Sequence, residues 1–346
     1  MLDFWKNRKI LVTGHTGFKG SWLCEALTLA GADVTGYALE PPTDPALFSV
    51  LGLEDRMRSV IGDIRDLESL KKVFSETQPE FVLHMAAQPI VRTSYREPVY
   101  TYETNVMGTV NVMECLRLSD SVRSFLNVTT DKVYDNRELG KGFVETDYLD
   151  GYDPYSNSKS CSELVTHSYQ RSFLSDGRIA VSTARAGNVI GGGDFAADRI
   201  IPDCVRAAAK GVPVVLRNPD SIRPFQHVLE PVAVYLMILE RQYRDGSLAG
   251  SYNVGPDLSD CVRTGELTQL FADAWGSGFR YEVHPDGGPH EAGFLKLDCT
   301  KLKQTFGWAP KWNIGEAVQK TAEWSKAYLA GEEMQEITDR QIRAFF

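Results

Sequence analysis

The stretch from Lys9 to Trp22, KILVTGHTGFKGSW, most constrains how this chain can fold. Its apolar start, Ile10 to Val12, predicts a short buried strand. Glycine then recurs at every third position, and apolar residues at helical spacing follow from Trp22. The glycines are Gly14, Gly17 and Gly20. A strand, a glycine-rich turn and a helix together hold a dinucleotide diphosphate, because glycine lets the backbone approach the phosphates and the helix N-terminus faces their charge. A simple turn would also use glycine, but the position between strand and helix favours phosphate binding.

Composition excludes several classes of function. The chain has 346 residues, 43% of them hydrophobic, which predicts a large core and more than one domain. A net charge of −9 argues against a surface for nucleic acid or for an anionic membrane. No apolar run is long enough to span a bilayer, and no signal-peptide core follows the basic N-terminus. Scattered cysteines predict free thiols in a reducing cytoplasm, and the histidines have no metal-ligand spacing, so we expect no metal.

Strands and helices alternate regularly as far as residue 188, which predicts an α/β fold with a Rossmann-type doubly wound parallel sheet. Further strands are expected at 32–39, 58–62, 81–85, 125–128 and 179–184, and helices at 67–77, 98–118 and 152–174. We therefore assign residues 1–188 to a dinucleotide-binding domain and 189–346 to a smaller mixed α/β lobe that binds substrate. Residues 222–255, with a helix at 229–241 and a strand at 251–254, are expected to return to the first domain. Residues 255–256 and 285–294 are expected to form loops of the lobe.

An acidic residue near the end of the second strand can bind the adenosine ribose. Glu40 lies about 20 residues after the glycine turn, where a carboxylate accepts a hydrogen bond from the 2′-hydroxyl and repels a 2′-phosphate. This position favours NAD over NADP as cofactor. A solvated loop carboxylate is an equally good interpretation of Glu40.

Two clusters of residues carry chemistry. Thr129 to Tyr134 (TTDKVY) follows the fifth strand, and reactive groups collect at the carboxyl ends of such strands. Tyr155 and Lys159 are four residues apart, on one face of a predicted helix. An ammonium beside a phenol favours the phenolate and lowers its pKa, so we expect Tyr155 to take a proton from a substrate hydroxyl. The alternative is a surface pair, which the glycine turn earlier in the chain makes a poorer explanation.

Five segments together resemble the extended short-chain dehydrogenases/reductases, and within them the nucleotide-sugar 4,6-dehydratases: GHTGFKGSW, TTDKVYDN, YSNSKS, GNVIGGGD and SIRPFQHV. The resemblance runs over nearly the whole chain and implies NAD as cofactor. It implies that Asp63 and Ile64 contact adenine, that small residues after the fourth strand leave room for the cofactor, and that Asn105 shapes the site. The expected cofactor-binding residues are Gly14, Thr16, Gly17, Phe18, Lys19, Gly20, Glu40, Asp63, Ile64, Ala86, Ala87, Gln88, Asn105, Thr129, Tyr155 and Lys159.

The resemblance also implies catalytic roles. Tyr155 removes the proton of the sugar 4-hydroxyl, Thr130 holds that hydroxyl, and Lys159 holds the nicotinamide ribose. Asp131 is our choice for the acid that protonates the departing 6-hydroxyl, which requires a pKa raised by burial. Lys132 stands where dTDP-glucose dehydratases have the glutamate that removes the C-5 proton. Either Lys132 is that base, with a depressed pKa, or it only binds and another group or Tyr155 takes the proton.

Arginines are expected to hold the substrate's diphosphate. Arg223 and Asn188 resemble the family's arginine and asparagine on this group, and Arg92 can reach sugar or phosphate. Arg199 and Arg217 are weaker candidates, for which a position as surface arginines is the better interpretation. The resemblance alone implies a cytidine substrate, CDP-glucose, and an early step toward the dideoxy sugars of surface polysaccharide. It also implies a homodimer or homotetramer. The competing functions are a nucleotide-sugar 4-epimerase, which needs no acid–base pair after the fifth strand, and a non-catalytic NAD-sensing protein, which would not need both Tyr155 and Lys159.

Overall fold

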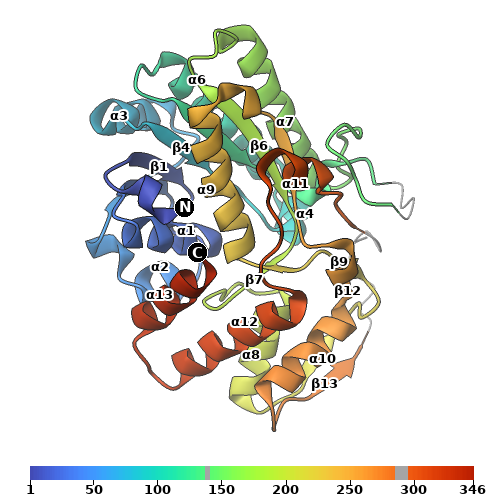
Figure 1. Cartoon of the computed structure of the whole chain (residues 1–346). Helices are drawn as coiled ribbons and strands as arrows, with labels where there is room; N and C mark the ends of the chain where they lie inside the picture. The colour runs from blue at the N-terminus through green and yellow to red at the C-terminus, as the bar shows by residue number, and fades with distance from the viewer. Residues whose placement is uncertain (137–140, 285–294) are drawn as a thin grey trace.

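The structure, a computed structural model, describes residues 1–136, 141–284 and 295–346 (Figure 1). Its centre is a seven-stranded sheet in the order β11-β6-β5-β4-β1-β2-β3, with every neighbouring pair parallel. The strands are β1 (Lys9–Thr13), β2 (Asp33–Ala38), β3 (Arg58–Ile61), β4 (Phe81–His84), β5 (Ser124–Val128), β6 (Ala180–Ala186) and β11 (Ser251–Val254). The predicted doubly wound parallel sheet is confirmed. Strand order reverses between β1 and β4, the place where such sheets bind ligands.

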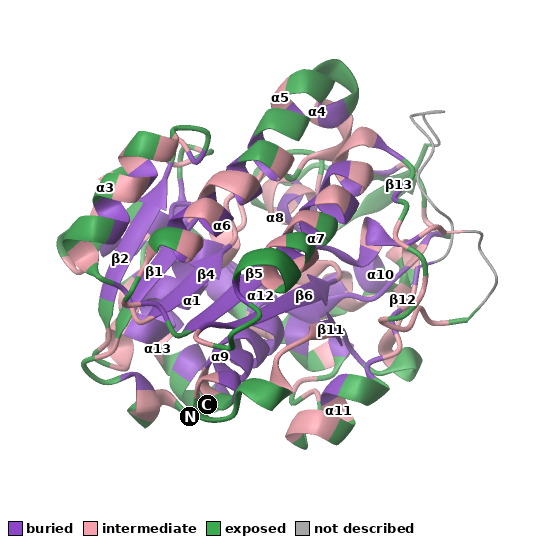
Figure 2. Cartoon of the chain, turned by 90° about the horizontal axis from the view of Figure 1, so that it is seen from above, coloured by how far each residue is buried: buried purple, intermediate pink, exposed green. Residues whose placement is uncertain are grey.

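Apolar residues point to both faces of this sheet, as a sheet covered by helices on two sides requires. In β1, Ile10 and Val12 join one core cluster, whereas Leu11 joins the other. The two helical layers enclose the buried strands (Figure 2). The first layer holds α3 (Leu67–Thr77), α6 (Gly108–Leu118) and α7 (Pro154–Phe173), and the second holds α1 (Phe18–Leu29), α9 (Leu229–Arg244) and α13 (Met334–Phe345).

The helix expected over residues 98–118 has an irregular middle. It consists of α5 (Pro98–Tyr102), a π-helical turn (Glu103–Met107) and α6. Asn105 lies in the π turn, where its side-chain oxygen accepts a hydrogen bond from the Gln88 N–H at 2.8 Å and its Nδ2 donates to the Gln88 carbonyl at 3.1 Å. Such turns occur mostly at functional sites, and this one presents Asn105 to the chain that follows β4.

The second half of the chain builds the lobe at the lower right of Figure 1. Its core packs Leu267 and Phe271 of α10 against Val318 of α12. The elements of this half are β7 (Val189–Ile190), α8 (Ile200–Lys210), β8 (Val214–Leu216), β9 (Ile222–Arg223), β10 (Gln226–His227), β12 (Val262–Arg263), α10 (Thr264–Trp275), β13 (Tyr281–Val283), α11 (Thr300–Phe306) and α12 (Ile314–Leu329). Shorter helices elsewhere are α2 (Leu47–Val50), α4 (Val91–Arg96) and 3-10 turns at Leu2–Trp5, Leu53–Asp55, Asp131–Val133, Gly246–Leu248 and Leu258–Asp260. The expected loop at 285–294 lies outside the described residues.

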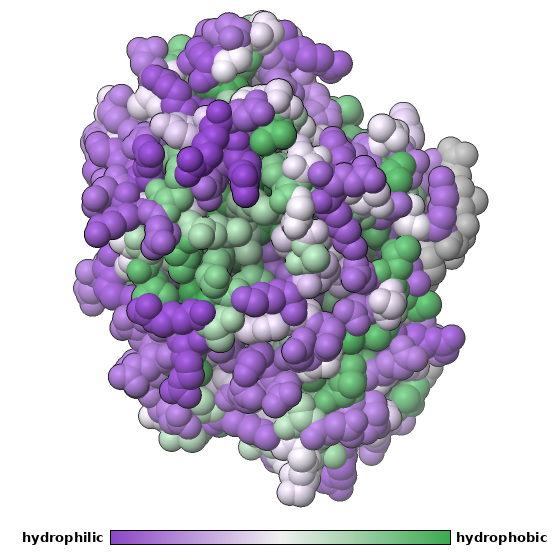
Figure 3. Space-filling model, viewed as in Figure 1, coloured by the Kyte–Doolittle hydropathy of each residue, from purple (hydrophilic) through white to green (hydrophobic). Residues whose placement is uncertain are grey.

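The chain crosses between its two halves more than once. The edge strand β11 pairs with β6, and α9 packs on β5 and β6. The last helix, α13, packs against α1, although the sequence analysis placed it with the lobe. On the face seen in Figure 3, apolar residues gather near the middle, over the region where both termini lie in Figure 1. No helix among the described residues is both long and apolar enough to cross a bilayer.

Candidate active site

The glycine turn lies between the end of β1 and the start of α1, where two of its glycines, Gly14 and Gly20, leave no room for a side chain. A Cβ on Gly14, whose φ is +81°, would lie 2.8 Å from the Ala86 nitrogen, and one on Gly20 would lie 2.1 Å from the Gly14 carbonyl oxygen. Gly17 is the N-cap of α1 and no side chain caps the helix, so the first-turn N–H groups remain available for an anion. The backbone cradle expected for a dinucleotide diphosphate is therefore present.

Residues expected to bind the adenosine half lie around this turn. The Thr16 hydroxyl donates to the Leu39 carbonyl at 2.9 Å, which ties the turn to the exposed residue Glu40 just beyond β2. Hydrogen bonds from Arg65 hold the pKa of the Asp63 carboxyl below its usual value, with the Arg65 Nε 3.0 Å away. Sequence analysis missed Arg65. Ile64 is buried, and the helical surface at Gly108 is open enough to receive its side chain.

Hydrogen bonds to the hydroxyls of Thr13 and Thr101 hold the chain that follows β4. The Ala86 N–H donates to the Thr13 hydroxyl at 3.2 Å, and Ala87 follows, half-buried. The Gln88 side chain donates to the Thr101 hydroxyl at 2.8 Å, while Asn105 holds its main chain from both sides. This segment is fixed in place before any ligand arrives.

Asp131 and Lys132 lie in the short 3-10 turn Asp131–Val133 after β5, and Thr130 is the N-cap of this turn. The Thr130 hydroxyl donates to Asp131 Oδ1 at 3.0 Å, whereas Asp131 Oδ2 is buried and has no hydrogen-bond partner among the described residues. Asp131 is 2% exposed. Burial raises the pKa of its carboxyl, although the nearby charges of Lys132, Arg223 and Lys19 oppose that shift. This is the direction that a general acid requires.

Tyr155 and Lys159 occupy the first half of α7. The Tyr155 hydroxyl is hydrogen-bonded to Thr130, so a chain of hydrogen bonds runs from Tyr155 through Thr130 to Asp131. The expected lowering of the phenol pKa is not present: burial raises the pKa of Tyr155 to about 12. Lys159 donates to the Val128 carbonyl at 3.1 Å, and burial lowers its pKa to about 8. Desolvation therefore outweighs the phenol–ammonium effect in this protein.

A further buried cation faces the same site. Lys19, the residue before Gly20, donates to the hydroxyl of Tyr235 on α9 at 3.2 Å. Burial lowers the pKa of Lys19 to about 8, and the charges of Arg199 and Lys159 act in the same direction. Tyr235 is fully buried in the apolar stretch of α9 at residues 232–239, and no sequence signal distinguished it.

The expected phosphate ligands divide into two groups. Arg223 is buried, and its charge opposes the rise in the pKa of Asp131. The charge of Arg199 likewise opposes the rise in the pKa of Tyr155, and Arg199 forms an ion pair with Asp194 at 3.0 Å. Arg217 instead pairs with Asp198 at 2.9 Å. Arg92 lies half-buried on α4, which packs against α7, and Asn188 lies half-buried between β6 and β7. The structure brings Arg223 and Arg199 to the catalytic residues, whereas no contact of Arg217 with them is observed among the described residues.

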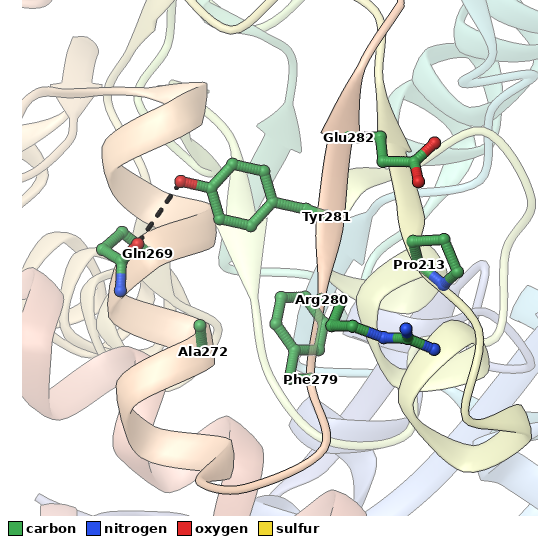
Figure 4. A pocket seen from close by; sticks show the side chains of 7 residues that line it. All are labelled: Pro213, Gln269, Ala272, Phe279, Arg280, Tyr281 and Glu282. Carbon is green, nitrogen blue, oxygen red and sulfur yellow. Dashed lines mark hydrogen bonds between the residues drawn. The ribbon is translucent and has the colours of Figure 1, made fainter.

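A cavity of about 380 Å³ lies in the lobe, away from these residues (Figure 4). Tyr281 donates to Gln269 across it at 3.3 Å. It is lined by Pro213, Gln269, Ala272, Phe279, Arg280, Tyr281 and Glu282. None of the expected site residues lines this cavity. Within the described ranges, no cluster of His, Cys, Asp and Glu could hold a metal ion.

Sequence analysis also missed a buried network behind the strand ends. Arg185 on β6 binds both Glu163 on α7 and the hydroxyl of Tyr134. Two signals were available: an arginine in an otherwise uncharged buried strand, and a glutamate one helical turn after Lys159. A buried charge requires a partner, and each signal points to the other.

Comparisons with known proteins agree with this geometry. Residues 11–321 match the sequence profile of the GDP-mannose 4,6 dehydratase family. The chain is 45% identical over 346 residues to CDP-glucose 4,6-dehydratase of Salmonella typhimurium, covering 98% of this chain and 96% of that one. The crystal structure of Thermus thermophilus UDP-glucose 4-epimerase in complex with NAD is 26% identical, with a TM-score of 0.77 over 92% of this chain and 98% of that one. That of Bacillus anthracis dTDP-glucose 4,6-dehydratase with NAD has a TM-score of 0.78 at 22% identity, covering 95% and 99%. The chain therefore belongs to the GDP-mannose 4,6 dehydratase family of extended short-chain dehydrogenases/reductases.

Proposed function

We propose that this protein is a CDP-glucose 4,6-dehydratase, a lyase that converts CDP-D-glucose to CDP-4-dehydro-6-deoxy-D-glucose and water. The 45% identity over almost the whole chain to a CDP-glucose 4,6-dehydratase carries the choice of substrate. The buried acid Asp131, hydrogen-bonded through Thr130 to Tyr155, supports dehydration rather than simple epimerisation, since an epimerase needs no acid for a leaving hydroxyl.

The cofactor is NAD, and the residues around the glycine turn fit it. Gly14, Gly17 and Gly20 leave the backbone open where a diphosphate must approach, and the uncapped start of α1 offers N–H groups to its charge. Glu40 lies where a carboxylate would take the adenosine ribose, and Lys159 is our candidate for the nicotinamide ribose. When bound, NAD supplies a reversible two-electron oxidation of the sugar at C-4 and the later reduction at C-6.

The protein's own residues move the protons. Tyr155 is our candidate to accept the proton of the sugar 4-hydroxyl. It can do so only as the phenolate, which burial disfavours by raising its pKa to about 12, and its hydrogen bond to Thr130 keeps the phenol oxygen oriented for the transfer. Once C-4 is a ketone, the hydrogen at C-5 becomes acidic. A base removes it while Asp131, whose pKa burial raises, gives a proton to the 6-hydroxyl, which leaves as water. C-5 then regains a proton as C-6 is reduced.

Lys132 is our candidate for the base at C-5. It is half-buried, and its charge lies close enough to Asp131 to oppose the rise in that carboxyl's pKa. Lys132→Ala tests this role by solvent-deuterium exchange at C-5. Loss of exchange with C-4 oxidation intact supports it, whereas undiminished exchange assigns the step to another group.

The nucleotide sugar is assigned to the lobe, residues 189–346, and the cofactor to residues 1–188 with 222–255 returning to them. Arg223 and Arg199 are the cations best placed for the substrate's diphosphate, since both act electrostatically on catalytic residues. Asn188 and Arg92 are further candidates for sugar or phosphate. Arg217, already paired with Asp198, is the weakest of the set.

The alternative function is another nucleotide-sugar 4,6-dehydratase or a 4-epimerase. Purified protein incubated with CDP-, dTDP-, GDP- and UDP-glucose distinguishes them. Only a dehydratase yields a 4-keto-6-deoxy product, recognised by its ultraviolet absorbance in alkali. Turnover restricted to CDP-glucose is the expected result, and an epimerised sugar without dehydration would exclude the proposal.

We also place the enzyme in the cytoplasm as a homodimer or homotetramer, at an early step toward dideoxy sugars of surface polysaccharide such as lipopolysaccharide O-antigen. The neighbouring elements α5, the π turn and α7 pack together and present exposed apolar side chains to solvent. Val99 is 70% exposed, Leu164 52% and Met107 51%. A second copy of the chain would cover this surface.

A further inference from the structure

One ion pair lies wholly inside the first half of the chain, behind the catalytic residues. The side chains of Arg185 and Glu163 are 1% and 0% exposed, and two parallel hydrogen bonds of 3.0 Å join them. The Thr183 hydroxyl donates to the same carboxylate at 2.7 Å. Burial alone would raise the pKa of Glu163, but the Arg185 charge and these hydrogen bonds hold it below its usual value. The pair is therefore charged, rigid and well satisfied.

Both ends of the segment from Thr129 to Tyr134 are attached to this pair. At the first end, the Thr129 hydroxyl donates to Glu163 Oε1 at 2.5 Å. At the last end, the Tyr134 hydroxyl accepts a hydrogen bond from Arg185 Nη1 at 2.9 Å and donates to Asn253 Oδ1 at 2.5 Å. The Tyr134 ring is 1% exposed and stacks on Phe143 with centroids 4.8 Å apart.

The residues between these ends are the reactive ones. Thr130 caps the short 3-10 turn that contains Asp131 and Lys132, and this turn has few main-chain hydrogen bonds of its own to fix it. Tyr155 and Lys159 belong to a different element, α7, whose N-terminus is capped by Asp153. Tyr155 and Lys159, which serve oxidation at C-4, are thus held by a helix. The segment anchored at its ends carries Thr130 close to its first end and the elimination groups, Asp131 and Lys132, closer to its last end.

We propose that Tyr134, acting with Arg185 and Glu163, is a positioning residue for the elimination step: it fixes the far end of the turn that carries Asp131 and Lys132. The proposal rests on the proposed dehydratase function. Loosening this end displaces the acid and the base without moving Tyr155 or Lys159. Oxidation at C-4 then continues, while elimination slows.

Tyr134→Phe is the first test, because it removes one hydroxyl and keeps the stacked ring. Relative to wild type, kcat for CDP-glucose should fall about 10- to 100-fold, as small displacements of catalytic groups do, with KM little changed. Reduced nicotinamide should accumulate during turnover, since C-4 oxidation outruns elimination, and its near-ultraviolet absorbance reports this in a stopped-flow experiment. Solvent deuterium should enter C-5 more slowly.

Tyr252→Phe is the matched control. Tyr252 is 2% exposed and its hydroxyl bonds to the Leu248 carbonyl, far from the turn in sequence. Tyr252→Phe should keep wild-type kcat and show no accumulation of reduced nicotinamide, whatever its effect on the melting temperature. If Tyr134→Phe also melts earlier but turns over normally without accumulation, its role is only structural and the proposal is wrong.

The other end of the turn offers a second pair, which remains informative if Tyr134→Phe fails to fold. Thr129→Val and Thr183→Val each remove one hydroxyl from the Glu163 carboxylate, but only Thr129 belongs to the anchored segment. Thr129→Val should reproduce the accumulation of reduced nicotinamide, Thr129→Ser should restore turnover, and Thr183→Val should behave as wild type. Equal accumulation in both valine variants would overturn the proposal. A wild-type protein that forms no product from CDP-glucose would instead refute the proposed function.

Discussion

Replacing Asp131 by asparagine should raise the free energy of unfolding and lower kcat, because the buried carboxyl destabilises the fold and supplies a proton to the reaction. Asp131 is 2% exposed, and its Oδ2 has no hydrogen-bond partner among the described residues. A buried polar group left without a partner costs about 1–3 kcal/mol of folding free energy. Asparagine has the same shape and leaves a polar atom at the same buried position, so it keeps this cost, but it cannot ionise. At neutral pH we therefore expect the free energy of unfolding of Asp131→Asn to exceed that of wild type by the cost of the buried charge, about 1.4 kcal/mol for each unit by which burial raises the pKa of Asp131.

The sign of the pH dependence follows from the raised pKa of Asp131. Burial disfavours the ionised form of Asp131 in the folded state, so its pKa is higher there than in the unfolded chain, where it is about 3.9. Wild type therefore loses stability as the pH rises from the pKa of the unfolded chain to the higher pKa of the folded protein. Asparagine does not ionise. The stability difference between variant and wild type should therefore be small near pH 4, grow with pH and then level off. Urea unfolding of both proteins at several pH values measures it.

Activity should change in the opposite direction. Loss of a positioned general acid slows a reaction about 10²- to 10⁴-fold, so kcat of Asp131→Asn should fall by that factor. Oxidation at C-4 needs Tyr155 rather than Asp131, and reduced nicotinamide should therefore build up. Two results would refute this reasoning: a variant that retains kcat within a few-fold of wild type, or one whose stability difference is the same at pH 4 and pH 8.

Three further predictions use simpler assays. Tyr155→Phe should lower kcat about 10²- to 10⁴-fold with no build-up of reduced nicotinamide, since the first proton transfer is lost; normal turnover would exclude its role as base. Gly20→Ala should abolish NAD binding in a fluorescence titration, because its Cβ would lie 2.1 Å from the Gly14 carbonyl oxygen, whereas the open position Gly246→Ala should not. If the proposed oligomer forms through the surface of α5, the π turn and α7, Val99→Glu combined with Leu164→Glu should convert it to monomer in sedimentation velocity, and an unchanged sedimentation coefficient would contradict this interface.

The parallel sheet could be predicted from sequence because its signals are local. The buried strands β1 and β4 consist mainly of short apolar runs. The glycines between β1 and α1 and the apolar face of Leu67–Thr77 fix the first crossovers. The π turn at Glu103–Met107 could not be predicted, since it depends on the contact of Asn105 with Gln88, which is distant in sequence. The packing of α13 against α1 could not be predicted either, because the two helices lie at opposite ends of the sequence.

Motifs placed the catalytic residues along the chain, but not their electrostatics. The raised pKa of Asp131 followed from burial, as expected. For Tyr155 the expected direction was wrong, because a sequence pattern shows that an ammonium lies near a phenol and not how much solvent both have lost. Arg65 and Tyr235 were missed for a related reason: their importance lies in partners from other elements.

The origin of the seventh strand has a consequence for biosynthesis. β6 carries Arg185, and its outer edge is covered by β11, which leaves the ribosome after α8, β10 and α9. Until then a nascent chain exposes the unpaired edge of a strand whose seven residues are all buried in the finished protein. Such edges recruit other strands, so chains truncated before β11 should aggregate, and holding chaperones should act on this interval of synthesis.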